Sequence, residues 1–123
     1  MQIPKNLLYS KNHLWLRKIG LVDYYVGITD FAQKEIGTIK SLIMESPGKS
    51  IKKNTCWGSI IGIEKSFSLI MPFDCKILIT SKAEDLNNLT LNNNPYYFWF
   101  AVICGHCQPN DLLSHDQYKQ LTK

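Results

Sequence analysis

The sequence contains almost no arginine, and its positive charge is spread along the chain. Arg17 is the single arginine among 123 residues, and the lysines are scattered apart from a small group at Lys49, Lys52 and Lys53. A nucleic-acid-binding surface usually combines a basic face rich in arginine with stacking aromatic side chains. The net charge of +4 is therefore typical of a soluble surface, and we expect no nucleic-acid partner.

Long apolar segments are also absent. No stretch reaches the roughly 18 apolar residues that a membrane span requires, and residues 1–15 hold no apolar run of signal-peptide length. We therefore expect a cytoplasmic protein without a membrane partner. In that reducing compartment the cysteines should be mostly thiols. They are Cys56, Cys75, Cys104 and Cys107.

The most informative stretch is residues 57–75, where apolar residues alternate on both sides of the polar triplet Glu64, Lys65 and Ser66. Alternation with period two predicts half-buried strands, and one strand of this length would be unusual. We therefore predict a hairpin that reverses near the triplet, with Lys65 at its tip. The residues expected to share the core face are Trp57, Ile61 and Ile63 before the reversal, and Phe67, Leu69 and Met71 after it.

Lys65 has two interpretations. A lysine at a hairpin tip is usually a solvated charge. Alternatively, the hairpin presents a long, flexible amine to a modifying enzyme, and amide formation would remove the charge and extend the arm. The spacing alone does not choose between them.

Other short patterns predict the remaining elements of one domain covering residues 1–123. Many short strands with turn signals and little helix are typical of a sandwich or barrel-like β domain. Capping residues predict three short helices. The further strands are expected at residues 14–16, 22–28, 38–44, 75–80 and 96–103, with a polar loop at 45–54. The helices are expected from Thr29 or Asp30 to Gly37, from Ser81 towards the asparagine-rich run 87–94, and from Asp111 or Ser114 through Tyr118 and Leu121.

The tetrapeptide Cys104–Cys107 resembles the active-site motif of protein disulfide isomerases. In a thioredoxin-like domain this motif comes early and opens a helix, whereas here Gln108 and Pro109 follow at once, close to the end of the sequence. A zinc site would need these two cysteines together with His106 or His115, without a clear second ligand pair. We therefore predict that Cys104 and Cys107 are structural or surface thiols.

Several separated segments resemble one family, the lipoyl-carrying H protein of the glycine cleavage system. The most specific is the eleven-residue run 27–37, which is close to the family pattern G-I-T-[DE]-[FY]-A-Q-x-x-L-G. The segments are YSKNHLWL from Tyr9, VGITDFAQKEIG from Val26, the run around Lys65, Asn94-Pro95-Tyr96, and LLSHDQYKQL from Leu112.

This resemblance implies a mainly β protein: a barrel-sandwich hybrid of the lipoyl-domain type with short peripheral helices and a C-terminal helix. It also implies that Lys65 carries lipoate, attached by a lipoate ligase or lipoyltransferase. Such a protein is a carrier rather than an enzyme, because the cofactor supplies the chemistry. Its arm would shuttle an aminomethyl group from glycine decarboxylase to aminomethyltransferase, and dihydrolipoamide dehydrogenase would reoxidise it.

The chain departs from the family pattern at positions that concern the arm. Leu14 stands where the family has glutamate, and Gly62 and Leu69 replace the acidic residues three before and four after the lysine. Because an acidic wall would stabilise a cationic aminomethyl group, Leu14 weakens that role specifically. Two alternatives therefore stay open: a lipoyl relay or carrier serving 2-oxoacid dehydrogenases or another redox partner, and an unmodified interaction module.

Overall fold

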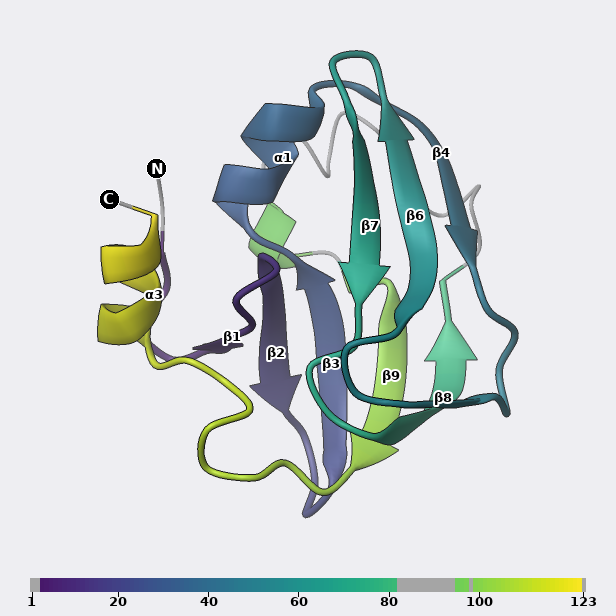
Figure 1. Ribbon diagram of the computed structural model, residues 1–123, viewed down its shortest axis with the longest axis vertical. Coiled ribbons are helices and arrows are strands. Elements are labelled where there is room, and N and C mark those ends of the chain that lie inside the picture. Colours follow the sequence, from purple (N-terminus) through teal and green to yellow (C-terminus); the bar gives the residue numbers. More distant parts are fainter. Residues whose placement is uncertain (1–2, 82–94, 98, 123) are drawn as a thin grey trace.

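The protein is built from two antiparallel β-sheets that face each other, with short helices at the side (Figure 1). A computed structural model describes residues 3–81, 95–97 and 99–122. The larger sheet has the strand order β1-β2-β3-β9-β8-β5, and the smaller has the order β4-β6-β7. The strands are β1 (Leu8–Tyr9), β2 (Leu14–Lys18), β3 (Asp23–Ile28), β4 (Ile39–Met44), β5 (Ser50–Ile51), β6 (Cys56–Gly62), β7 (Ser66–Ile70), β8 (Cys75–Thr80) and β9 (Ala101–Gly105).

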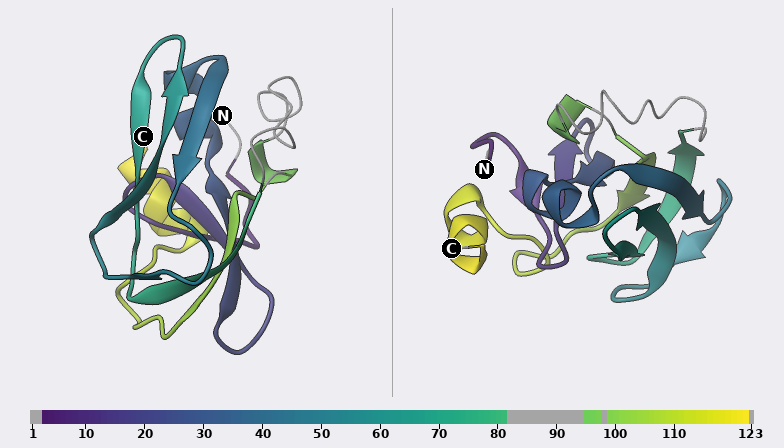
Figure 2. Two further views of the ribbon diagram at one scale, coloured as in Figure 1. Left: turned by 90° about the vertical axis from the view of Figure 1, so that its right-hand side faces the viewer. Right: turned by 90° about the horizontal axis from the view of Figure 1, so that it is seen from above.

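Among the residues that the structure describes, three short helical segments accompany the sheets. Helix α1 (Asp30–Ile36) follows β3 directly and lies beside the ends of β6 and β7, whereas α3 (His115–Leu121) lies at the far side of β1 (Figures 1 and 2). A single 3₁₀ turn, η2 (Pro95–Tyr97), precedes β9. Within the described residues, no helix has the length and apolar character needed to cross a bilayer. The mainly β architecture with short helices is as predicted.

The main core fills the space between the two sheets. It includes fully buried side chains from the larger sheet, such as Val26 and Ile103, and from the smaller sheet, such as Ile60 and Leu69. A second cluster lies between α3 and the larger sheet, where the rings of Tyr9 and Tyr118 stack with their centroids 4.6 Å apart. This second cluster is what holds the C-terminal helix on the domain.

Helix boundaries agree well with the capping residues. Thr29 is the N-cap of α1, Gly37 is its C-cap with φ 76°, and Ser114 forms a full capping box with Gln117 at the start of α3. These signals are local in sequence, so they can be found without knowledge of the tertiary structure. The helix predicted after Ser81 lies outside the described residues.

Two expectations about the strands are wrong. The aromatic strand predicted at 96–103 begins only at Ala101, because Pro95 opens a 3₁₀ turn. The carbonyl of Pro95 accepts a hydrogen bond from the Trp15 indole at 3.1 Å. Proline has no N–H to give to a strand ladder, which favours this outcome. The polar loop 45–54 contains the short strand β5, which extends the larger sheet by pairing with β8.

A β-bulge in β6 overturns part of the predicted core face. Cys56 pairs with Ile70 and Gly58 pairs with Leu69, so Trp57 is an extra residue between two consecutive partners. An extra residue reverses the inward and outward positions of everything that follows. Ile60 is therefore fully buried, while Ile63, which was expected in the core, is 59% exposed. Ile61, also expected there, pairs with the exposed Ser41 and Ser66 on the outer face.

The bulge predicts unequal effects for two neighbouring isoleucines. Replacing Ile60 by alanine should lower the free energy of unfolding by about 2–5 kcal/mol, because it leaves a cavity between the sheets. Ile61→Ala, the matched control on the outer face, should cost about 1 kcal/mol or less. Urea unfolding of the two variants measures the difference. Equal losses would contradict the register described for β6.

Candidate functional site

Lys65 lies in the turn between β6 and β7, at the upper end of the smaller sheet in Figure 1. The N–H of Gly62 donates to the carbonyl of Lys65 at 3.2 Å, so Ile63 and Glu64 make the reversal. The predicted hairpin is confirmed, and Lys65 stands at the start of the returning strand, just past the apex. Its side chain is 56% exposed.

This turn is fixed to the end of helix α1 by two backbone hydrogen bonds. Glu64 N–H donates to the carbonyl of Ile36 at 3.1 Å, and Ile63 N–H donates to the carbonyl of Thr38 at 2.9 Å. The last carbonyls of a helix have no partner within the helix and need one elsewhere. The turn supplies that partner, and in return the helix end fixes the position of the backbone that carries Lys65.

Gly62 allows this close contact. A Cβ atom at Gly62 would lie 2.2 Å from Ile36 Cγ2 and 2.4 Å from the Ile36 carbonyl oxygen. No side chain can occupy that space unless the helix end moves away. The position three residues before Lys65 is therefore glycine for a packing reason, which accounts for the missing acidic residue there.

The start of α1 is held by two hydroxyl groups, one from its own N-cap residue and one from a distant part of the chain. Thr29 Oγ1 accepts a hydrogen bond from Ala32 N–H at 3.3 Å, and the Tyr96 hydroxyl accepts one from Asp30 N–H at 3.0 Å. Burial raises the pKa of Tyr96 to about 12, so this phenol stays neutral. A helix of seven residues is too short to be stable alone, and these contacts supply the stability that so short a helix lacks.

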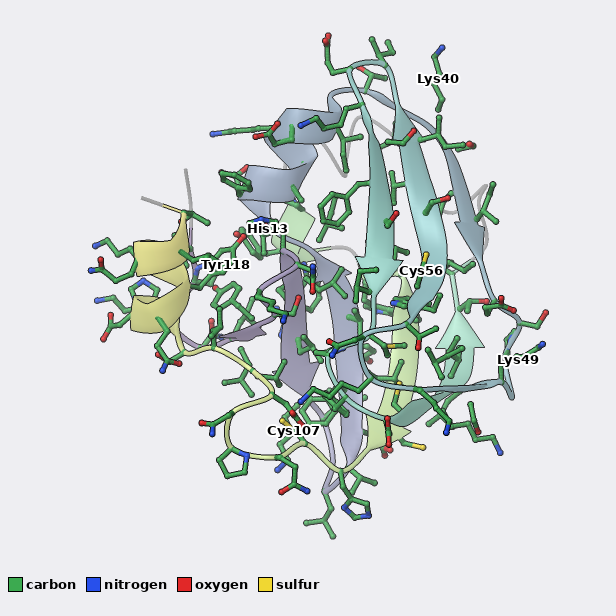
Figure 3. The ribbon with its side chains drawn as sticks, viewed as in Figure 1. His13, Lys40, Lys49, Cys56, Cys107 and Tyr118 are labelled. Carbon is green, nitrogen blue, oxygen red and sulfur yellow. The ribbon has the colours of Figure 1, made fainter. Side chains whose placement is uncertain are left out.

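A chain of three hydroxyl and imidazole groups joins α1 to the C-terminal helix. The Tyr118 hydroxyl lies 2.7 Å from Thr29 Oγ1 and 2.8 Å from His13 Nδ1 (Figure 3). Since Thr29 Oγ1 accepts from Ala32, its own proton can go to Tyr118, and the Tyr118 proton can go to His13. This assignment requires neutral His13 with its proton on Nε2. Burial lowers the pKa of His13, against the opposing effect of the Glu35 carboxylate.

An open groove adjoins the Lys65 amine on the helix side. Lys65 Nζ lies 3.1 Å from Glu35 Oε2, and about half of each side chain is exposed to solvent. The Phe31 ring lines the same groove and stacks on His13 with centroids 4.4 Å apart. An exposed ion pair of this kind is weak, so the amine can leave Glu35. The groove is lined by Phe31, Lys34, Glu35, Gly37, Glu64 and Lys65.

The structure separates residues that the sequence suggested belong together. Leu14 and Leu69, which replace acidic residues of the family pattern, are both fully buried in the main core. An ionised carboxylate there would be costly. The acidic residue beside Lys65 is Glu35, which sequence reasoning missed. The sequence feature that could have identified Glu35 is its position on the expected helix, one turn after Phe31 and two residues before Gly37.

The Cys104–Cys107 segment lies at the opposite end of the molecule from the Lys65 turn, where Figure 3 labels Cys107. No helix begins directly after it, and burial together with the Asp111 carboxylate raises the pKa of the Cys107 thiol. Both features oppose a reactive thiolate. Over the described ranges, no three His, Cys, Asp or Glu side chains are grouped so as to hold a metal ion.

Comparison with known proteins gives one consistent result. The family model described as glycine cleavage H-protein matches residues 7–123. The glycine cleavage system H protein of Anoxybacillus flavithermus is 33% identical over 128 aligned positions, which cover 98% of this chain and 97% of that protein. That of Brevibacillus brevis is 32% identical, with 100% and 99% covered.

A solved structure agrees with the fold. The crystal structure of a glycine cleavage system H protein from Mycobacterium marinum superposes with a TM-score of 0.82. The two chains are 20% identical, and the match covers 96% of this chain and 97% of the other. At that identity the likeness concerns the fold alone, which is the two-sheet architecture described above.

Gly62→Ala should disturb the turn that carries Lys65. The added methyl group would meet backbone atoms of Ile36, so we expect a loss of about 1–3 kcal/mol in the free energy of unfolding and faster amide exchange at Ile63 and Glu64. Gly20→Ala is the control, because the nearest atoms there belong to the flexible Asp23 side chain. Hydrogen exchange read by NMR compares the two variants. Unchanged amide exchange in Gly62→Ala would argue against the contact between the turn and the end of α1.

His13 should make stability depend on pH. Its folded pKa lies below the ordinary value of about 6.5 that the unfolded chain retains. The unfolded state therefore binds the proton first, and stability should fall as pH drops from about 6.5 towards the folded pKa. His13→Asn removes this titration and keeps a residue that tolerates the positive φ of 69°. Urea unfolding at several pH values should give a flatter profile for the variant, and identical slopes would refute this assignment.

Proposed function

This chain belongs to the glycine cleavage H-protein family, the lipoyl carriers of the glycine cleavage system, and we propose that Lys65 is the residue that bears its lipoyl group. The single observation that carries the assignment is the position of Lys65 in a turn held rigidly between two strands and a helix end. A modifying enzyme acts on the folded domain, so it needs an accessible amine on a backbone of defined shape. Lys65 meets both conditions.

The surroundings of Lys65 suit an amide-linked arm. Acylation removes the positive charge but leaves one N–H, which can still donate to Glu35. The open groove lined by Phe31 and Glu35 gives the first part of the arm an aromatic ring to lie against. When bound, the lipoyl group would supply the disulfide that takes up and releases both the transferred group and electrons.

The protein's own contribution is presentation. Helix α1 and the turn fix where the arm begins, and the weak Lys65–Glu35 contact leaves its remainder free to move. Tethering of this kind raises the local concentration at each partner to the order of millimolar. We propose a carrier rather than an enzyme, acting in the cytoplasm with glycine decarboxylase, aminomethyltransferase and dihydrolipoamide dehydrogenase, after loading by a lipoate ligase or lipoyltransferase.

The other candidate lysines are less suitable. Lys53 Nζ lies 2.6 Å from Asp111 Oδ1, a contact that raises the pKa of the lysine and keeps it charged. Lys76 lies within β8, where neighbouring strands flank it on both sides. Lys52 follows β5 without a pair of strands on either side.

One observation favours a second duty. Leu14 is buried in the core, so the glutamate of the family pattern has no counterpart at that position, and the acidic side chains that line the groove are Glu35 and Glu64. A lipoyl carrier serving 2-oxoacid dehydrogenases, whose acyl groups are uncharged at the point of attachment, would not need a carboxylate at position 14. Assaying the lipoylated protein with glycine decarboxylase and with a 2-oxoacid dehydrogenase subunit separates the two duties.

The attachment site can be tested by intact mass. Incubation with a lipoate ligase, lipoate and ATP should add one lipoyl mass to the wild type and none to Lys65→Arg, which keeps the charge but offers no amine to acylate. Lys53→Arg is the matched control and should be modified like the wild type. A wild type that stays unmodified, or a Lys65→Arg variant that gains the mass, would contradict the assignment of Lys65.

A further inference from the structure

Six neighbouring positions on the outer face of the smaller sheet carry no charged side chain, and Lys40 and Glu45 border them at the two ends of β4. Strands β4, β6 and β7 place two cross-strand rows on this face, and all six side chains are serine or isoleucine. One fifth of the whole chain is charged, so an uncharged exposed surface of this kind needs an explanation. The serine–isoleucine face consists of Ser41, Ile61 and Ser66 in one row and Ile43, Ser59 and Ser68 in the other.

The face exists because of the bulge at Trp57. The inner rows, which include Ile60 and Leu69, pack into the core, and the alternate residues must point outward. Ile43 is 58% exposed, and Ile63, which follows the face into the turn, is 59% exposed. Single exposed apolar residues are ordinary. A surface whose cross-strand neighbours are only isoleucine and serine has the charge-depleted composition of an interface centre.

The serine–isoleucine face is continuous with Lys65. Ser66, at the upper end of β7, is the next residue in the chain, and Lys40 on β4 borders the same end of the sheet in Figure 3. Any protein that acts on the Lys65 amine must cover surface next to the turn. On one side that surface is α1, with the charged Asp30, Lys34 and Glu35; on the other it is the uncharged face.

The area of the face favours a brief contact over a stable dimer. Three strands spaced by about 4.8 Å, with about three residues each at 3.3 Å, span roughly 15 Å by 10 Å. A stable interface buries about 800 Å² on each partner, several times this area. The face together with the turn is of the size that a transient enzyme encounter uses.

We propose that the enzyme which attaches the lipoyl group docks on the serine–isoleucine face, with Ile43 and Ile63 as its apolar contacts. The inference rests on the proposed function of Lys65. The enzyme's matching surface is uncharged and apolar, and it leaves the α1 side of the turn open. Docking of this kind should depend only weakly on salt, because its contacts, Ile43 and Ile63, are uncharged.

The test measures acceptor kinetics with a lipoate ligase, lipoate and ATP. Ile43→Arg and Ser68→Arg put a charge on opposite edges of the serine–isoleucine face, at exposed positions that should leave thermal unfolding unchanged. We expect each to raise the KM for the carrier about fivefold or more, the loss typical of one important interface residue, with kcat unchanged. The KM of the wild type should change less than twofold between low and high salt.

Two controls make the result specific. Leu21→Arg introduces the same charge in the turn between β2 and β3, where Leu21 is 91% exposed, and should leave KM unchanged. The second, Glu35→Gln, removes the charge that contacts the Lys65 amine on the α1 side, and the KM increase expected for it is smaller than that of either face variant. Docking on α1 would instead raise the KM of Glu35→Gln above that of either face variant and make the KM of the wild type fall steeply as salt is removed. That pair of results would overturn the proposal.

Failure of the proposal is distinct from failure of the Lys65 assignment. If the wild type is lipoylated and both face variants keep its KM, the docking proposal is wrong and Lys65 still stands. If the wild type is never lipoylated, the assignment of Lys65 fails and the docking proposal fails with it. If sedimentation shows a wild-type dimer that Ile43→Arg converts to a monomer, a second copy occupies the face, and the proposal is again overturned.

Discussion

The position of Lys65 depends on two hydrogen bonds between backbone groups. The carbonyls of Ile36, the last residue of α1, and of Thr38, just beyond its C-cap, accept from the turn, so the lysine is placed by a helix rather than by its own hairpin alone. That helix has only seven residues and cannot be stable by itself. Its stability comes from the contacts at its N-terminus, which Thr29 and Tyr96 provide. The site is thus controlled from the far end of the helix.

This dependence explains why segments remote from Lys65 share one structural task. Tyr118 reaches α1 from the C-terminal helix, His13 reaches Tyr118 from the segment before β2, and Tyr96 comes from the turn before β9. Each belongs to a different segment among those whose sequence resembles the H-protein family, and together they meet at the start of α1. The sequence pattern that resembles the family is therefore largely the set of residues that hold this helix. The helix in turn positions Lys65 at its other end.

The features that could be predicted from the sequence are those encoded within a few residues. Thr29, Gly37 and Ser114 mark helix ends through bonds to close neighbours, and the alternation around Lys65 marks a hairpin. The bulge could not be predicted, because one extra residue in a strand pairing changes every later side chain but leaves no local signature. The pairing of Lys65 with Glu35 joins residues on separate elements, so it appears only when α1 is seen beside the turn.

The order of strands in the larger sheet has a consequence for how the chain reaches this structure. Strand β3 pairs directly with β9, so Val26 meets Ala101 only after the whole intervening chain has been looped out. The smaller sheet, in contrast, is made of strands that are near neighbours in the chain and lies entirely within that loop. Short loops close at lower entropic cost than long ones. The lysine hairpin can therefore pair while the larger sheet is still open, and joining β3 to β9 carries the larger loop-closure cost.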